Sequence, residues 1–407
     1  MFVRGAPVTI TGLVGRPELN GRAGTTLSFD GGRYGIKIQA QGMEPAAKLS
    51  VKPSNLEPRL DVEPADLDFA DPHGSLMRCS PEQLARLLQQ HGANPDVSGL
   101  IMALVSSLSL PEQAGFPAQW SRGGVDNVVE FMRAAGHRAV VEAMLAHPEE
   151  DRISAVGIHV LLFHLVAEVE RELGGSAMPA VLAVGGAAAV AGAMAAHPSN
   201  ESLLTAGCMV LKTMTSNDAR GWGEVGPTAC KRSVLEGGGI AALVRAMAAF
   251  PAAAALQEPA ASGLAHMVAG YPDACAAAVA AGAAAACVGG MRASVASATA
   301  QKKLCMLLVN LMQGAPDLPA AARAIADAGG PAAVCDALRM HVGEKPLFTS
   351  ACGVLVNLAG GGQHAATQRA GAPAVLRAAC DRDPWFARQE LAKRYLLLGD
   401  PPVGPGF

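Results

Sequence analysis

Few side chains in this sequence have the spacing of a binding or catalytic group, and the clearest are two amides. The letters LVNL occur at residues 308–311 and again at 355–358, which places Asn310 and Asn357 at equivalent points. An amide both donates and accepts hydrogen bonds, so one such side chain can satisfy a backbone N–H and a C=O together. Those backbone groups belong either to neighbouring loops of this chain or to a bound partner, and the residues alone leave both readings open.

Catalytic and metal-binding motifs are missing from the sequence. It contains no GxSxG, GxxxxGK[ST] or HExxH motif, and its ten histidines have no Cys or carboxylate at ligand spacing. Asp66 and Asp68 lack the glycine and the distal glutamate of a calcium loop, and Gly237–Gly239 lacks the preceding strand of a dinucleotide site. We therefore expect no enzyme activity, no metal and no cofactor.

The nine cysteines also lack a zinc or disulfide pattern, because none of them form a CxxC pair. Cys208, Cys305 and Cys352 each follow a recurring Met or Leu at one fixed spacing, which is typical of small apolar packing residues. Free thiols suit a reducing compartment, so we expect a cytoplasmic protein, with the nucleus as the alternative.

Composition limits the partners that charge alone would attract. The net charge is −3, so no general attraction to nucleic acid or membrane follows, although Met1–Arg59 carries eight Lys and Arg against four Asp and Glu. The N-terminus has no apolar signal core. The apolar stretch Ala274–Met291 has Gly282 at a turn position, so it predicts a helix pair rather than a membrane span.

A repeated helical unit should position the two amides. Six times a leucine follows a Met, Leu or Ala at the same sequence offset, and this constant spacing indicates a stacked repeat. The pairs are Met144 with Leu161, Met194 with Leu211, Met247 with Leu264, Met291 with Leu308, Leu338 with Leu355, and Ala379 with Leu396.

Each unit reads as three helices. Within 321–362, a short helix ends at Gly329-Gly330, Pro331 starts a second helix, and a third covers 348–358. Equivalent turns fall at Ala135-Gly136, Gly185-Gly186, Gly238-Gly239, Gly282 and Gly371. The units resemble armadillo repeats over about residues 124–400, in particular a subgroup whose second helix ends in the phrase AMxAHP. The resemblance implies a mainly α, armadillo-like α-solenoid of about six repeats, although HEAT-type repeats would give a similar pattern.

The resemblance also implies a concave groove that holds an extended partner segment. Helical geometry puts Ser350, Gly353 and Asn357 opposite the core side of the third helix, where we expect solvent. In armadillo proteins an asparagine here binds the backbone of a peptide, and Asn310 and Asn357 match that pattern. The equivalent residues of earlier repeats depart from it: Phe163, Thr213 and His266.

Residues 1–57 predict a different, all-β module. Alternating apolar and polar residues indicate four or five short strands separated by glycine turns. The order of residues 12–24, 29–34 and 51–56 resembles small SH3-like barrels of algal and protist multidomain proteins. The resemblance implies a docking face built from Pro17, Tyr34 and Arg33, with Phe29 in the core.

The remaining segments complete the domain plan. We expect an acidic, Pro-rich linker at 58–80, a helical N-terminal cap at 81–123 and a tail at 401–407. Ser80 and Gln83 have the spacing of a capping box at the start of the first helix of this cap. An enlarged loop at 215–228 contains Trp222 and Arg220 among several glycines. Trp222 is either an exposed anchor for a partner or packed back on the surface of the repeats.

These features favour a non-catalytic scaffold or adaptor that binds a protein or an extended peptide in the armadillo groove, with the SH3-like module as a second docking site. Two alternatives remain. One is an RNA-associated protein that uses the basic N-terminal module, and the other is a ubiquitin-ligase adaptor, by analogy with related domain fusions. No membrane association is expected.

Overall fold

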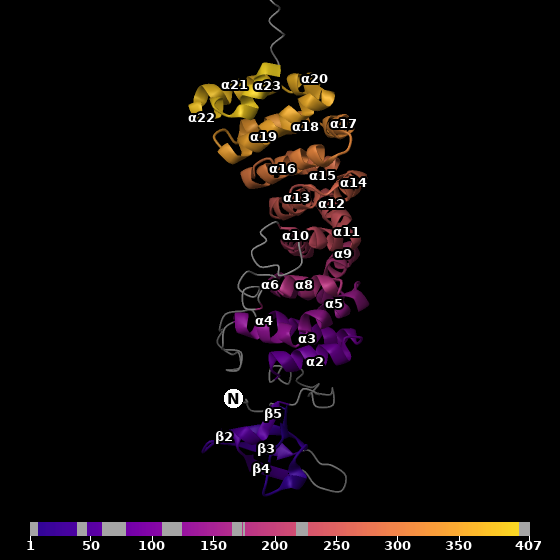
Figure 1. The fold of residues 1–407 in the computed structure, drawn as a ribbon, viewed down its shortest axis with the longest axis vertical. Coiled ribbons are helices and arrows are strands. Elements are labelled where there is room, and N and C mark those ends of the chain that lie inside the picture. Colours follow the sequence, from indigo (N-terminus) through magenta and orange to yellow (C-terminus); the bar gives the residue numbers. More distant parts are fainter. Residues whose placement is uncertain are drawn as a thin grey trace, which may run out of the picture. The chain divides into compact units, whose positions relative to one another are not determined.

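The computed structural model describes residues 7–38, 47–58, 79–107, 124–164, 173, 176–216 and 227–398. The chain forms two compact units, here called unit 1 (Met1–Ala189 with Gly221–Gly223) and unit 2 (Val190–Arg220 with Glu224–Phe407). Helices dominate both units, and an antiparallel sheet of five strands precedes them in the chain (Figure 1). The mainly α architecture with a small N-terminal β module is therefore as predicted.

The sheet has the strand order β4-β3-β2-β1-β5, so the last strand returns to pair with the first. Period-two alternation directs Val8, Ile10, Ile36 and Ile38 into one small core, which Leu56 closes with 6% of its surface exposed. The strands and short 3-10 helices are β1 (Pro7–Ile10), η1 (Pro17–Leu19), β2 (Ala23–Asp30), β3 (Arg33–Ile38), β4 (Ala47–Val51), η2 (Pro53–Asn55) and β5 (Leu56–Pro58).

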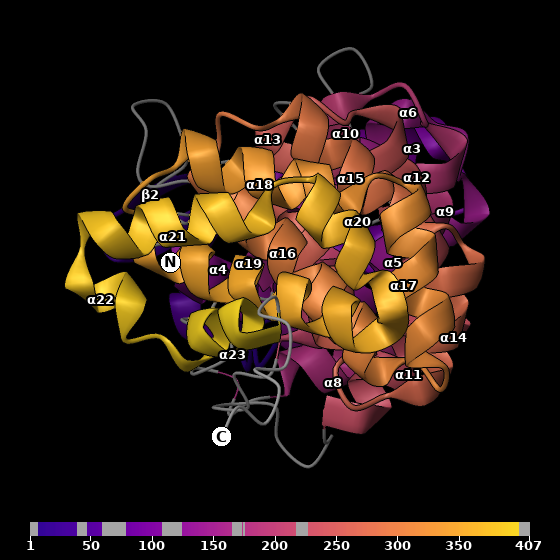
Figure 2. The same ribbon diagram turned by 90° about the horizontal axis from the view of Figure 1, so that it is seen from above.

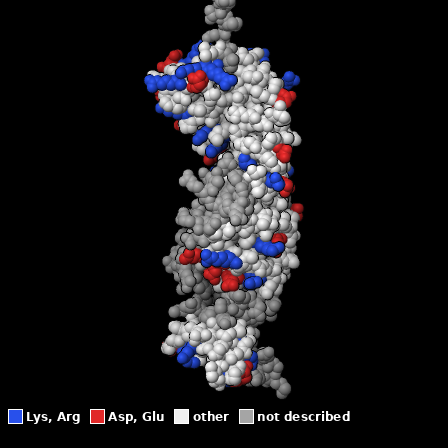
Figure 3. All heavy atoms as spheres, in the orientation of Figure 1, with Lys and Arg blue, Asp and Glu red and all other residues white. Residues whose placement is uncertain are grey.

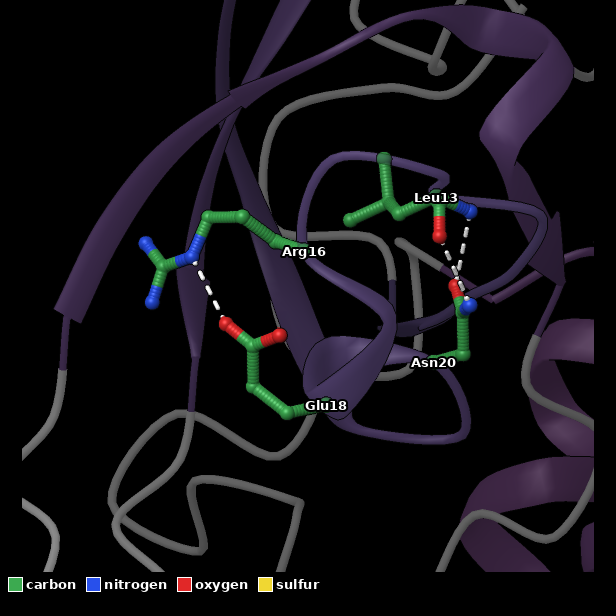
Figure 4. A network of polar contacts seen from close by, with 4 residues as sticks. All are labelled: Leu13, Arg16, Glu18 and Asn20. Atoms are coloured by element: carbon green, nitrogen blue, oxygen red, sulfur yellow. Dashed lines mark hydrogen bonds and ion pairs between the residues drawn. The ribbon is translucent and has the colours of Figure 1, made fainter.

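Two asparagines fix the long loop between β1 and β2. Asn20 accepts from the Leu13 N–H at 2.8 Å and donates to the Leu13 carbonyl at 3.0 Å (Figure 4). Asn55, in η2, donates to the Thr11 carbonyl at 3.0 Å. Both amides therefore satisfy backbone groups that no strand partner reaches, which holds the loop against the sheet.

Unit 1 continues with helices that follow the predicted repeat. Ser80 caps the first of them as expected, because its hydroxyl accepts from the Gln83 N–H while the Gln83 side chain accepts from the Ser80 N–H. The helices are α2 (Pro81–His91), α3 (Pro95–Ser107), α4 (Gly124–Arg133), α5 (Gly136–Ala146), α6 (Asp151–His164) and α8 (Ala177–Ala183); α9 (Gly186–Ala196) crosses from unit 1 into unit 2.

Helices α2 and α3 are the second and third helices of a further repeat. α2 packs on α5 and α3 packs on α6, the same pairing that successive repeats use. Leu88 and Val105, separated by the same sequence offset, are buried at the positions of Met144 and Leu161. Sequence reasoning assigned these helices only to a cap, because valine replaces the leucine on which the pattern was built.

Unit 2 continues the repeats, and its third helices pack in the order α10, α13, α16, α19 and α23. The first four follow one another along the stack in Figure 1, and the first helices α11, α14 and α17 share one side of it in Figure 2. The helices are α10 (Glu201–Thr215), α11 (Pro227–Glu236), α12 (Gly239–Ala249), α13 (Ala254–Val268), α14 (Pro272–Ala280), α15 (Ala283–Ala293), α16 (Ala298–Gly314), α17 (Leu318–Asp327), α18 (Gly330–Met340), α19 (Lys345–Leu358), η5 (Ala359–Gln363), α20 (His364–Arg369), α21 (Ala372–Arg382), α22 (Pro384–Ala387) and α23 (Glu390–Leu398).

The constant offset in the sequence corresponds to a buried contact between the second and third helices. Leu161, Leu211, Leu264, Leu308 and Leu355 are all fully buried, and so are the Met residues that precede the first four. In the last repeat, Leu396 is only half-buried, as expected where the stack ends and no further helix covers it. The armadillo-like α-solenoid thus follows from the packing of this chain itself.

In each repeat from α4 onward, the turn between the first and second helices has a left-handed residue. Gly185, Gly238, Gly282, Gly329 and Gly371 have φ between 78° and 87°, and Ala135 takes the same role with φ of 58°. The residue after this turn is also constrained, because a Cβ on Gly136 would overlap the Phe131 ring. The predicted turns are therefore confirmed.

Replacing Ala135 by glycine is expected to raise the free energy of unfolding of unit 1 by about 0.5 to 1 kcal/mol, because an L side chain is strained at positive φ. The matched control is Ala134→Gly, where φ is negative and glycine should instead destabilise by up to about 1 kcal/mol. Urea denaturation followed by circular dichroism measures both. If both variants changed the free energy of unfolding in the same direction, Ala135 would not be strained.

The C-terminal carbonyls of the second helices are satisfied in two ways. In α5 and α18 the histidine just after the helix reaches back to the preceding repeat: His147 Nε2 lies 2.9 Å from the Gly92 carbonyl, and His341 Nε2 lies 2.6 Å from that of Val295. A carbonyl only accepts, so Nε2 carries the proton in both rings.

The repeats of α12 and α15 lack this histidine and use a buried glutamine of their own third helix. Gln257 Nε2 donates to the Met247 and Phe250 carbonyls at 2.8 and 3.0 Å. Gln301 Nε2 donates to the carbonyls of Met291 and Ser294 at 2.9 and 3.2 Å. Both glutamines are fully buried, so each takes the place of water at the end of a second helix.

Candidate functional site

The candidate site is the side of α10, α13, α16 and α19 on which half-buried polar residues remain, here called the third-helix face. Third helices pack closely along the stack because small residues separate them: a Cβ on Gly263 would lie 3.3 Å from the Lys212 Cα. The residues that define the third-helix face are Met209, Lys212, Thr213, Glu258, His266, Lys302, Lys303, Met306, Asn310, Ser350 and Asn357.

The structure places the residues predicted to line the groove at equivalent positions of successive helices. Thr213, His266, Asn310 and Asn357 are each half-buried on α10, α13, α16 and α19. The Thr213 hydroxyl donates within its own helix to the Met209 carbonyl at 2.9 Å. The fifth residue, Phe163, ends α6, but its side chain lies outside the described residues.

The expectation that this side faces only solvent is wrong in part. Gly353 is buried, because α19 packs on α16 there and a Cβ would lie 3.2 Å from Val309. Asn310 Nδ2 donates to the Ala265 carbonyl of α13 at 2.9 Å. The Asn310 amide thus binds the stack itself, and only its oxygen remains to accept from a partner.

Asn357 differs from Asn310 although both belong to the same four-letter phrase. Its Nδ2 atom is inaccessible to solvent and has no hydrogen-bond partner. The π-helical turn η5 follows immediately and replaces a regular loop. Ser350, one helical turn after the start of α19, donates to the Pro346 carbonyl at 3.2 Å, so its hydroxyl proton is also used internally.

A group of lysines on the third-helix face was missed by sequence reasoning. Lys212 of α10 and Lys302 and Lys303 of α16 are half-buried, and Glu258 of α13 lies among them. Burial, followed by the charges of Lys302 and Lys212, lowers the pKa of the Lys303 ammonium group, and Glu258 opposes the shift. Helical periodicity applied to charge rather than to asparagine could have found this group.

On the second-helix side, an open hollow of about 510 Å³ lies between α15 and α18. Two of its polar groups are engaged: Arg339 forms an ion pair with Asp336 at 2.7 Å and donates to the Ala370 carbonyl at 3.0 Å. The other lining residues are Met291, Arg292, Val295, Ala333 and Met340.

The predicted docking face of the β module needs a correction. Tyr34 belongs to the core with 1% of its surface exposed, because the alternation of β3 places it on the same side as Ile36 and Ile38. Phe29, expected in the core, is 44% exposed and rests on Tyr34 with ring centroids 4.6 Å apart. A register irregularity between Thr26 and Ser28 brings Phe29 opposite Tyr34 at the end of the sheet.

Arg33 and Pro17, the other two residues of the predicted docking face, are exposed, and Arg33 is held by hydrogen bonds. Arg33 donates to the Ser50 hydroxyl at 3.0 Å and to the Ser50 carbonyl at 2.8 Å. Pro17 begins η1 at the surface, between Arg16 and Glu18, whose ion pair measures 2.9 Å (Figure 4). The loop anchors Trp222 and Arg220, like most of the linker at 58–80 and the tail at 401–407, lie outside the described residues.

The cysteines are packing residues, as expected. None of the nine cysteines forms a disulfide, and eight are buried. Burial raises the pKa of Cys208 and of Cys305 to about 12, so neither forms a thiolate near neutral pH. In the described ranges, three or more His, Cys, Asp or Glu residues nowhere come together as a metal site would require.

The apolar helices of the described ranges are short compared with a membrane span. Over the part of the chain that the structure describes, no single helix has both the length and the apolar character to cross a bilayer. Two helix pairs, α8 with α9 and α14 with α15, reach that length only together and are bent by 65° and 68°. The apolar stretch around Gly282 is the second of these pairs, as predicted.

Comparison with known proteins finds no matching protein family and no matching curated protein. Among solved structures, an engineered protein from a structural genomics consortium aligns over 69% of this chain and 98% of its own, with 15% identity and a TM-score of 0.49. A structure from work on a phosphorylation switch between cadherin and beta-catenin aligns over 83% of this chain and 80% of its own, with 14% identity and a TM-score of 0.29. Both similarities are weak, so the fold assignment rests on the repeat packing described above.

Proposed function

We propose that this chain is a non-catalytic interaction scaffold whose third-helix face binds an extended segment of a partner protein. The observation that carries the proposal is the row of half-buried polar side chains at one register of successive third helices, from Thr213 through His266 and Asn310 to Asn357. Half-buried polar groups repeated at the helix spacing suit an extended backbone, which offers a donor and an acceptor at regular intervals.

The finer assignments belong to the same proposal. The strand order and the 3-10 turn before β5 support an SH3-like barrel, with Phe29 in place of Tyr34 as its exposed aromatic. His147 and His341, bound to the preceding repeat, support the AMxAHP-type armadillo subgroup. A cytoplasmic location remains our proposal for the whole chain.

Photo-crosslinking at two positions of the third-helix face tests the proposed groove. In separate variants, a photoreactive amino acid replaces Met209 of α10 and Met306 of α16, both on the third-helix face. A third variant carries it at Met340 of α18, which is exposed and serves as the control. The full chain is expressed in the source cell, and crosslinked peptides are sequenced by mass spectrometry. We expect one partner segment to crosslink at both positions and not at Met340.

The spacing of the crosslinks makes the test specific. Neighbouring packed helices lie about 10 Å apart, so α10 and α16 are about 20 Å apart across α13. An extended chain advances about 3.3 Å per residue, so the two crosslinks should fall about six residues apart in the partner. Crosslinks to unrelated segments, or equal crosslinking at Met340, would argue against a groove for an extended chain.

A further inference from the structure

Three lysines of unit 2 gather on the third-helix face although they come from two helices separated by a third. Lys212 lies in the last turns of α10, and Lys302 and Lys303 lie in the first turns of α16. α13 separates these helices but approaches both closely, through Gly263 against Lys212 and through the Asn310 bond to Ala265. The lysine charges therefore act on one another across α13.

The positive charge of this group is not neutralised by the fold. Glu258 lies within electrostatic range of Lys303, but among the described residues none of the three ammonium groups has a carboxylate within ion-pair distance. Lys345, by comparison, lies 3.8 Å from an Asp383 carboxylate oxygen. Three partly buried cations against one carboxylate repel each other, and an anion placed among them would relieve that repulsion.

The surroundings decide which anion would fit. The lysines are flanked by Met209, Met306 and Val309, which offer apolar contact, and by the Asn310 amide. No Phe, Tyr or Trp occurs in α10, α13 or α16, whereas surfaces that bind single-stranded nucleic acid stack bases on aromatic side chains. Figure 3 shows that most of the described surface in that view is uncharged, so a local cationic group can select a ligand by charge.

We propose that the third-helix face selects an acidic extended segment of a partner protein, with its carboxylates held between Lys212 of α10 and Lys302 and Lys303 of α16. The proposal rests on the proposed function and adds the chemical class of the ligand. Lys212 and the lysine pair lie on either side of α13, so acidic residues at two separated points of the segment are required. Met209 and Met306 lie on the same helices as the lysines and would contact apolar side chains next to the acidic ones.

Two matched peptides test the charge preference with the full chain. A fluorescein-labelled peptide in which glutamate alternates with serine is titrated at near-physiological ionic strength, beside the same peptide with glutamine in place of glutamate. We expect the glutamate peptide to bind at least about tenfold more tightly. The double change Lys302→Glu with Lys303→Glu should remove that difference.

The control changes the same net charge elsewhere. Arg232 of α11 and Arg245 of α12 are exposed and lie off the third-helix face, so Arg232→Glu with Arg245→Glu should alter the affinity by less than about twofold. Circular dichroism confirms that each variant is folded. Equal affinities for the two peptides, or equal losses in the two double variants, would overturn the acidic preference.

Photo-crosslinkers at Met209 and Met306 distinguish the acidic preference from the proposed function, which is a groove for an extended partner segment. If the glutamine peptide crosslinks on the face as strongly as the glutamate peptide, an extended-segment groove stands and its acidic selectivity is wrong. If neither peptide crosslinks there, both proposals lose their support. A single-stranded oligonucleotide that binds through these lysines more tightly than the glutamate peptide would also refute the choice of a protein segment.

Discussion

Replacing Leu308 by alanine is expected to lower the free energy of unfolding by about 3 to 5 kcal/mol. Leu308 is fully buried in α16, where it packs in the register shared with Met291 of α15. Alanine removes the apolar contact and leaves a cavity that the helices on either side cannot close without moving. Because repeats interact mainly with their neighbours, the loss should appear first as faster amide hydrogen exchange in α15, α16 and α19.

The control for this prediction is a leucine near the end of the chain. Leu397 is 72% exposed, so Leu397→Ala should change the free energy of unfolding by less than about 0.5 kcal/mol. Urea denaturation followed by far-ultraviolet circular dichroism compares the two variants. Similar midpoints would mean that the constant Met-to-Leu offset does not mark the buried contact between helices.

Replacing Gln301 by leucine should lower the free energy of unfolding by about 2 kcal/mol, although leucine is the more apolar residue. The side chain is fully buried, and its amide binds the carbonyls of Met291 and Ser294 at the end of α15. Leucine cannot donate, so both carbonyls lose this donor in a place that water does not reach.

An exposed glutamine of the same helix provides the comparison. Gln313→Leu should have an effect within about 0.5 kcal/mol, since that side chain is in solvent. Hydrogen exchange should locate the damage of Gln301→Leu at the end of α15. A variant that proved more stable than the parent would show that the glutamine is a packing residue and that its hydrogen bonds contribute little.

The repeat was predictable because one contact recurs with a fixed sequence offset. The buried Met and Leu pairs, the left-handed turns at Gly238 or Gly329 and the Ser80 cap all depend on local geometry that a single sequence carries. The extra repeat formed by α2 and α3 escaped prediction because Val105 takes the place of the leucine, and the packing tolerates either residue.

The candidate site was harder to predict because neighbouring repeats decide it. Helical geometry alone placed Gly353 in solvent, but the distance between α16 and α19 decides that it is buried. Asn310 was proposed for a partner, and only the position of the Ala265 carbonyl shows that its N–H is used within the stack. Likewise, the strand irregularity before Phe29 decides which aromatic residue of the β module is exposed.

The two ways of capping the second helices have a consequence for how the array can change in evolution. Gln257 and Gln301 bind carbonyls of their own repeats, so these two caps do not depend on which repeat comes before or after them. His147 and His341 instead need the carbonyl of the repeat before them. Recombination that changes the number of repeats should therefore be selected against at the two histidine-linked boundaries, the second of which joins α18 to the loop after α15.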